Sequence, residues 1–279
     1  MMASVVTTIR VPTGRITAAG SRMSIWWRAF AHIALLVCSA RMAWAGPPFL
    51  TDDPGMPDYH HFEFYIFSTF DKASDGKQIT APAFEYNYTA GKNLFIHSVL
   101  PVLDEQPNSG SHAYGLGDVE LGLKYRFVHE SGARPAVAIF PLLELPTGDS
   151  DAGLGNGRVW GTFPVWLEKT WGPWTTDFGG GRAWNSASGQ KNYNFGGWLV
   201  TRSVTDRLIL GGEIYGQGAT LKEGERTTFV TFGGYYTPRF SCSGCQVLFD
   251  LGHTIAGETH TIGYLGLYWT WGHSEEKAH

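Results

Sequence analysis

Apolar and polar residues alternate along one stretch of the chain with the period of a β-strand. From Asp118 to Phe127 every second residue is apolar, and most of the residues between them are charged. Side chains on a strand point to opposite faces in turn, so this stretch is predicted to have one apolar and one charged face. Such a strand fits a soluble β-sandwich, whose apolar face packs a core, or a membrane barrel, whose apolar face meets lipid.

Similar strand-like stretches follow one another along most of the chain. We expect twelve of them between His61 and Trp271, with no helix among them, which excludes a βαβ architecture. The first is expected at His61–Phe70, the fourth at Leu116–His129 and the fifth at Arg134–Leu145. Regular repetition of strands without helices predicts an all-β fold.

The connections between these strands differ systematically in length. The odd-numbered connections up to the ninth are long and polar, whereas the even-numbered ones up to the eighth are tight, as at Gly91-Lys92. Outer-membrane barrels have long extracellular loops and short periplasmic turns, and a sandwich needs no such alternation. Residues 61–271 are therefore predicted to form a transmembrane antiparallel up-and-down β-barrel of about twelve strands. Both chain ends are then expected in the periplasm.

Tryptophans lie near the ends of the predicted strands, where aromatic rings favour the two membrane interfaces. The two sets are Trp171, Trp174, Trp269 and Trp271 at the periplasmic ends, and Trp160 and Trp184 at the extracellular ends. This distribution favours the barrel over the sandwich.

The N-terminal region has the features of an export signal. Arg28 precedes the apolar run Ala29–Val37, and Ala43-Trp44-Ala45 is typical of a cleavage site. We expect residues 1–45 to be a leader and secretory signal peptide, with Met1 or Met23 as the translation start. Residues 46–60 are predicted to form an extended periplasmic tail, and residues 272–279 a C-terminal tail.

The charge balance limits the classes of partner. The chain has 21 Lys and Arg against 25 Asp and Glu, and five of the basic residues lie in the first 45. This balance argues against a nucleic-acid partner, which needs a basic surface. The expected partners are the lipid bilayer and lipopolysaccharide of the outer membrane, the barrel-assembly machinery during insertion, and a small-molecule solute. No cofactor is expected.

Two features suggest chemistry, and a structural interpretation is preferred for both. Cys242 and Cys245 form a C-x-x-C pair, which predicts a local disulfide in an oxidising periplasm; a redox centre and a metal site are the alternatives. His97-Ser98 and Ser111-His112 are adjacent pairs of the kind a hydrolase could use, but no G-x-S-x-G motif is present. We therefore predict no catalytic residue, no metal site and no enzyme activity.

The charged faces of the strands carry the candidate functional residues. In a barrel these side chains point into the lumen, because a charge facing acyl chains is costly. The lumen candidates are Glu85, Asn87, Asp118, Glu120, Lys124, Arg126, Glu144, Glu213 and Asp250. Two roles remain open: ion pairs that fill the barrel, and the wall of a permeation path.

Several short motifs resemble a known family. They are Gly46–Pro54, Leu116–Asp118 with Tyr125–Phe127, and Phe140-Pro141 with Leu145–Asp149. The sequence resembles the "MetA-pathway of phenol degradation" family of outer-membrane transporters. The resemblance implies an outer-membrane barrel that passes small, often aromatic or hydrophobic, compounds. A closed structural or adhesion barrel and an outer-membrane lipid hydrolase are the alternatives.

Overall fold

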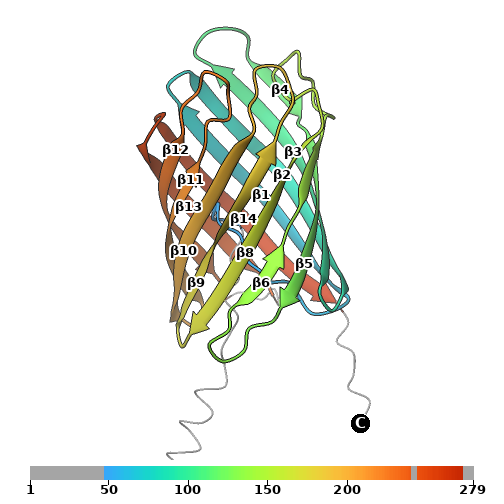
Figure 1. The fold of residues 1–279 in the computed structure, drawn as a ribbon, viewed down its shortest axis with the longest axis vertical. Helices are drawn as coiled ribbons and strands as arrows, with labels where there is room; N and C mark the ends of the chain where they lie inside the picture. Colours follow the sequence, from blue (N-terminus) through green and yellow to red (C-terminus); the bar gives the residue numbers. More distant parts are fainter. Residues whose placement is uncertain (1–46, 240–243, 273–279) are drawn as a thin grey trace, which may run out of the picture. The chain divides into compact units, whose positions relative to one another are not determined.

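The protein is a closed antiparallel β-barrel (Figure 1). The computed structural model describes residues 47–239 and 244–272. All 14 strand segments belong to one sheet, and the first, β1 (His61–Ala73), pairs with the last, β14 (His260–Gly272). Among these residues no helix is long and apolar enough to span a membrane. The other segments are β2 (Gly76–Gly91), β3 (Leu94–Pro107), β4 (Ala113–Leu116), β5 (Val119–Val128), β6 (Ala136–Ile139), β7 (Leu142–Leu145), β8 (Trp160–Trp171), β9 (Trp174–Trp184), β10 (Tyr193–Thr205), β11 (Leu208–Gln217), β12 (Thr227–Tyr236) and β13 (Gln246–Ala256).

Two of the barrel strands are interrupted. β4 and β5 both pair with β3, and β6 and β7 both lie between β5 and β8, so the fourteen segments make a barrel of 12 strands. The fold class predicted from the sequence is confirmed. The expected continuous strands Leu116–His129 and Arg134–Leu145 are each broken, the first at Gly117-Asp118 and the second at Phe140-Pro141. Pro141 cannot donate a ladder hydrogen bond, which accounts for the second break.

The first connection differs from the prediction. Residues 71–79 were expected to form a long loop, but β1 and β2 continue as a hairpin with only residues 74–75 between them. Asp71 pairs with Gln78 and Lys72 with Lys77 in this extension. Polar residues on both faces are suited to a hairpin that extends beyond the bilayer into water. The same polar composition is typical of a loop, which is why the sequence predicted one.

The connections at the two ends of the barrel remain unequal. The start of β1 and the end of β14 lie at the lower end of the barrel in Figure 1. Tight turns such as residues 172–173 and 206–207 lie at the same end. The upper end carries the longer connections 146–159, 185–192 and 218–226. This arrangement is typical of outer-membrane barrels.

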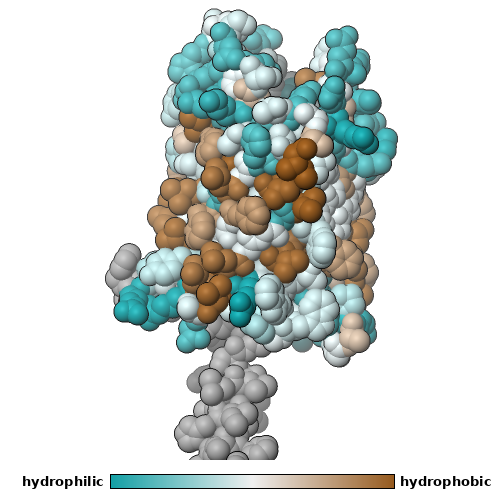
Figure 2. Space-filling view, turned by 90° about the vertical axis from the view of Figure 1, so that its left-hand side faces the viewer, coloured by the Kyte–Doolittle hydropathy of each residue, from teal (hydrophilic) through white to brown (hydrophobic). Residues whose placement is uncertain are grey.

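The outer face of the barrel is apolar around its middle (Figure 2). On β5 the outward side chains of Leu121, Leu123, Tyr125 and Phe127 are 43–50% exposed, whereas Lys124 between them is only 5% exposed. Figure 2 shows apolar residues across the middle of the face in view and polar residues at both ends. An apolar surface of this extent needs lipid contact, so the barrel spans a membrane.

Residues 47–57 lie inside the barrel, which corrects the prediction of a periplasmic tail for residues 46–60. Phe49, Thr51 and Asp53 are buried, and Phe49 packs with its ring centroid 6.1 Å from that of Tyr235 on β12. Phe49 also joins an apolar cluster that fills part of the lumen. The Pro- and Asp-rich composition does indicate an irregular segment, but the lumen wall offers charged and amide partners that hold it in place.

Candidate functional site

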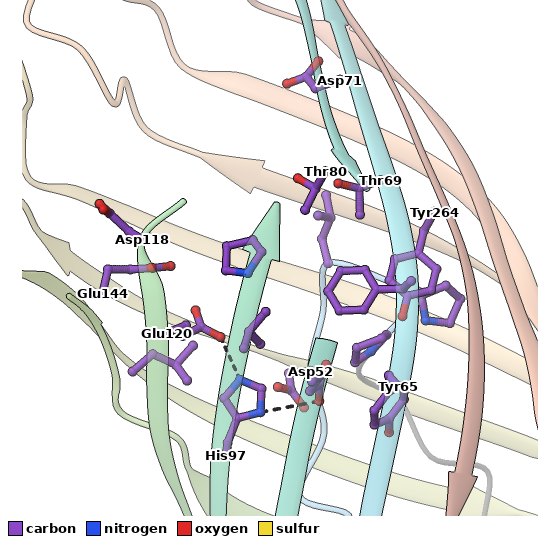
Figure 3. Close-up of a pocket in the computed structure, with 18 of the residues that line it drawn as sticks. Asp52, Tyr65, Thr69, Asp71, Thr80, His97, Asp118, Glu120, Glu144 and Tyr264 are labelled. Atoms are coloured by element: carbon purple, nitrogen blue, oxygen red, sulfur yellow. Dashed lines mark hydrogen bonds and ion pairs between the residues drawn. The ribbon is translucent and has the colours of Figure 1, made fainter. Parts of the chain in front are cut away.

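A large cavity lies in the lumen, and Figure 3 shows part of its wall in close-up. Its volume is about 830 Å³, in the range of small-molecule sites. The N-terminal segment, β1–β3, β5, β7, β13 and β14 form most of its wall, and the loop 146–159 contributes residues 153–156. The cavity is the candidate functional site because it lies inside a closed wall whose outer face contacts lipid.

The structure brings most of the predicted lumen residues together. Seven of the nine line the cavity. They are Glu85, Asn87, Asp118, Glu120, Lys124, Glu144 and Asp250. Of the other two, Glu213 contacts the backbone of the N-terminal segment. Arg126 is half-buried and does not line the cavity.

Buried polar side chains on β2, β3 and β5 form a continuous network on one wall. Asn87 donates to Glu85 at 2.7 Å. The Nδ1 atom of His97 lies 2.8 Å from Asn87 Oδ1, and its Nε2 atom lies 2.7 Å from Glu120 Oε1 (Figure 3). The sequence predicts Glu85, Asn87 and Glu120 as lumen residues but not His97, whose position on the same face of the strands follows only from the register Asn87↔His97↔Gly122.

The N-terminal segment is held at two points. The ammonium of Lys124 on β5 lies 2.8 Å from Asp52 Oδ1 and 3.6 Å from Asp53 Oδ1. On the other side, the carboxylate of Glu213 on β11 accepts hydrogen bonds from the backbone N–H groups of Leu50 (2.9 Å) and Thr51 (2.7 Å). Both anchors are buried, so each contact is protected from bulk solvent and weakly screened.

Asp118 holds the loop 146–159 against the cavity. Its carboxylate accepts hydrogen bonds from the backbone N–H groups of Gly148 (2.9 Å) and Asn156 (2.7 Å). Leu154, between them, is 5% exposed and lines the cavity. Asp118 therefore lies at the break between β4 and β5 and holds the connection 146–159 over the lumen.

The cavity wall is strongly acidic. Among the described lining residues there are nine carboxylates, against one lysine and one histidine. Lys124 is already paired with Asp52, and His97 with Glu120. The acidic residues are Asp52, Asp53, Glu63, Asp71, Glu85, Asp118, Glu120, Glu144 and Asp250. Sequence reasoning missed Glu63 because the first strand has apolar residues on both faces, and it missed Asp71 because that residue was assigned to the first connection.

The structure separates the residues of one candidate catalytic pair. His97 is buried in the lumen network, whereas Ser98, next along β3, donates to the backbone oxygen of Tyr86. Adjacent residues on a strand point to opposite faces, so this serine and histidine cannot act on one substrate. In the second pair, His112 contacts Asp104. In residues 47–239 and 244–272 no group of three or more His, Cys, Asp and Glu side chains is placed to hold a metal ion.

Cys245 takes part in a disulfide bond. Its predicted partner, Cys242, lies outside the described residues, so the pairing Cys242–Cys245 stays a prediction. The predicted cleavage site before Gly46 and the tail 273–279 also lie outside them.

Comparisons with known proteins support the fold. No protein-family model matches the chain, and a search of curated sequences finds no match. The fold is similar to that of an outer membrane channel from Pseudomonas putida F1, with a TM-score of 0.64 and 14% identity over 81% of this chain and 100% of the other. It is also similar to the NanC porin, with a TM-score of 0.51 and 7% identity over 74% of this chain and 98% of the other.

Proposed function

We propose that this protein is a passive outer-membrane channel for small molecules, including aromatic or hydrophobic ones. The observation that carries the proposal is the cavity of about 830 Å³, lined by charged and aromatic side chains and enclosed by a lipid-facing barrel. Two folds of the same kind belong to proteins described as a channel and a porin, which supports this choice. The resemblance to the phenol-degradation family supports the aromatic part of the substrate class.

The wall of the cavity suits amphipathic solutes. Aromatic side chains such as Tyr65, Phe67 and Tyr264 line it beside the carboxylates. The aromatic side chains can pack against the apolar ring of a solute, while the carboxylates beside them can bind its polar substituent. One wall can therefore bind both parts of a substituted aromatic molecule. The route proposed is diffusion through the lumen, with no energy coupling.

Single-channel recording with a placed thiol tests this proposal. In a Cys242→Ser, Cys245→Ser background, Glu144→Cys puts a thiol on the cavity wall, whereas Leu143→Cys puts one on the lipid face of the same strand, where Leu143 is 52% exposed. A bulky water-soluble thiol reagent should lower the conductance of the Glu144→Cys barrel and leave the Leu143→Cys barrel unchanged.

A closed structural barrel is the second candidate, because the N-terminal segment occupies part of the lumen and is held there by Lys124 and Glu213. A barrel that inserts into planar bilayers but carries no current, with or without the reagent, would favour this second candidate over a channel.

A further inference from the structure

One carboxylate of the cavity, Asp250 on β13, stands apart from the paired charges. Lys124 and His97 lie on β5 and β3, separated from β13 by β2, β1 and β14 in the sheet. Asp250 is 8% exposed, and its remaining exposed part lines the cavity. Its Oδ1 atom has no hydrogen-bond partner among the described residues.

The absence of a side chain at Gly233 on β12 makes room for the Asp250 carboxylate. Gly233 on β12 is the cross-strand partner of Asp250, and a Cβ atom at Gly233 would come within 2.9 Å of Asp250 Oδ1. The carboxylate therefore lies against backbone and the Thr231 hydroxyl, and no basic or amide side chain of the described residues contacts it. A buried carboxylate in such surroundings needs a positive charge from elsewhere if it is to remain ionised.

An aromatic wall adjoins the carboxylate. Tyr264 on β14 is the direct partner of Asp250, and the hydroxyl of Tyr264 has no hydrogen-bond partner in the described part of the chain. The ring of Tyr264 stacks on that of Phe67, with centroids 5.1 Å apart and planes 16° apart. Gly266 makes room for this arrangement, since a Cβ there would lie 2.8 Å from the Tyr264 ring.

We infer that Asp250, Tyr264 and Phe67 form a subsite for the ammonium group of a small organic cation. The carboxylate supplies the opposite charge, the tyrosine hydroxyl supplies a hydrogen-bond acceptor, and the stacked rings attract a cation over their faces. The inference rests on the proposed function for the route by which the solute arrives, and it narrows the substrate class from aromatic compounds to those bearing an ammonium group.

The same geometry disfavours other ligand classes. An anion would be repelled, because nine carboxylates line the cavity. A calcium ion takes six to eight oxygen ligands, and this subsite offers about three oxygen atoms, two from the carboxylate and one from the hydroxyl. A neutral aromatic molecule could contact the rings but would leave the Asp250 charge uncompensated.

Calorimetric titration of the detergent-solubilised full barrel tests the subsite. The probes are benzylammonium chloride and benzyl alcohol, which share the ring and differ in charge. The ammonium should bind and the alcohol should bind far more weakly. Asp250→Asn should weaken ammonium binding about tenfold or more, because a hydrogen bond to a charged group contributes at least that much. Tyr264→Phe and Phe67→Leu should each weaken it about threefold.

Three controls keep the test decisive. Glu223→Gln removes an exposed acid that does not line the cavity, and it should leave binding unchanged. Asp250→Glu keeps the charge and should retain binding where Asp250→Asn loses it. If Asp250→Asn does not fold, as judged by heat-modifiable migration on a gel, unchanged binding in both aromatic variants overturns the subsite. Equal affinity for the two probes also overturns it.

The result separates the subsite from the channel. Titration in detergent requires no conduction, so a barrel that binds benzylammonium but carries no current overturns the proposed channel alone. A barrel that conducts but binds neither probe overturns the subsite alone.

Discussion

The alternation of residues along β5 assigns each side chain to lipid or to lumen. Leu123 is 50% exposed on the outer face, and its neighbour Lys124 is 5% exposed and paired with Asp52 inside. The same alternation is visible in the sequence, so the two faces of this strand could be predicted without a structure. The partner of Lys124 could not, because Asp52 lies 72 residues earlier in a segment with no periodic pattern.

Substitution at Leu123 tests this face assignment. Leu123→Lys should lower the yield of folded barrel, since a lysine near the bilayer midplane costs about 2–4 kcal/mol. The measurement is the fraction of heat-modifiable protein after refolding into lipid. Glu120→Gln, on the lumen face of the same strand, removes a charge without adding one to lipid and should fold like the parent. Normal folding of Leu123→Lys together with failure of Glu120→Gln would mean that the two faces are inverted.

In the lumen network, too, the face of each residue could be predicted from the sequence but its contact partners could not. Glu85, Asn87 and Glu120 are predicted as inward-facing residues, yet their contact through His97 depends on the register between three strands. A shift of one residue in either pairing would move His97 to the lipid face. Local periodicity does not fix that register, so the network could be identified only in the folded barrel.

At the scale of elements, the N-terminal segment is the part of the fold least visible in the sequence. Its irregular conformation follows from its prolines, but its location depends on wall positions far along the chain. Gly197 on β10 is one of them, because a Cβ atom there would lie 2.0 Å from the hydroxyl of Thr51. This glycine within a strand thus marks the close approach of a side chain from another segment.

Gly197→Val should displace the segment from the lumen. Overpacking of this kind typically costs about 1–3 kcal/mol, which corresponds to about a tenfold rise in the population with the segment released. The measurement is the rate at which a water-soluble reagent labels Pro54→Cys, a position less than 2% exposed in the parent, with Cys242 and Cys245 replaced by serine.

Gly216→Val is the matched control for this experiment. A Cβ atom at Gly216 on β11 meets nothing closer than 3.9 Å, so the labelling rate should stay near that of the parent. Equal acceleration by both variants would indicate a general loosening of the barrel and would contradict a specific contact between Gly197 and the segment.

At the scale of the whole molecule, closure of the sheet could be predicted because many weak local signals agree. Two-faced strands, tight turns at one end and tryptophans near strand ends all favour a barrel, and each has its own physical cause. The outline of the cavity could not be predicted, because it depends on where residues 47–57 and the loop 146–159 lie inside the wall. Those positions are set by single contacts such as Asp118 with Gly148 and Asn156.

The charge of the assembled lumen makes a prediction for the whole barrel. Nine carboxylates face the cavity against Lys124 and His97, so cations should be concentrated there and anions depleted. The reversal potential in a potassium chloride gradient should therefore show cation selectivity, and the selectivity should decline as ionic strength rises, because dissolved ions screen the charges that face the cavity.

Variants of single lumen charges test the origin of that selectivity. Glu144→Gln should reduce the preference for cations, whereas Glu223→Gln in the outer loop should not. Lys124→Gln would raise the net negative charge of the wall but would also leave Asp52 and Asp53 without their cation, so its conductance should rise together with its selectivity as the segment loosens. A rise in cation preference without any change in conductance would show that Lys124 contributes charge but does not hold the segment. Anion selectivity of the parent barrel would contradict an acidic permeation path altogether.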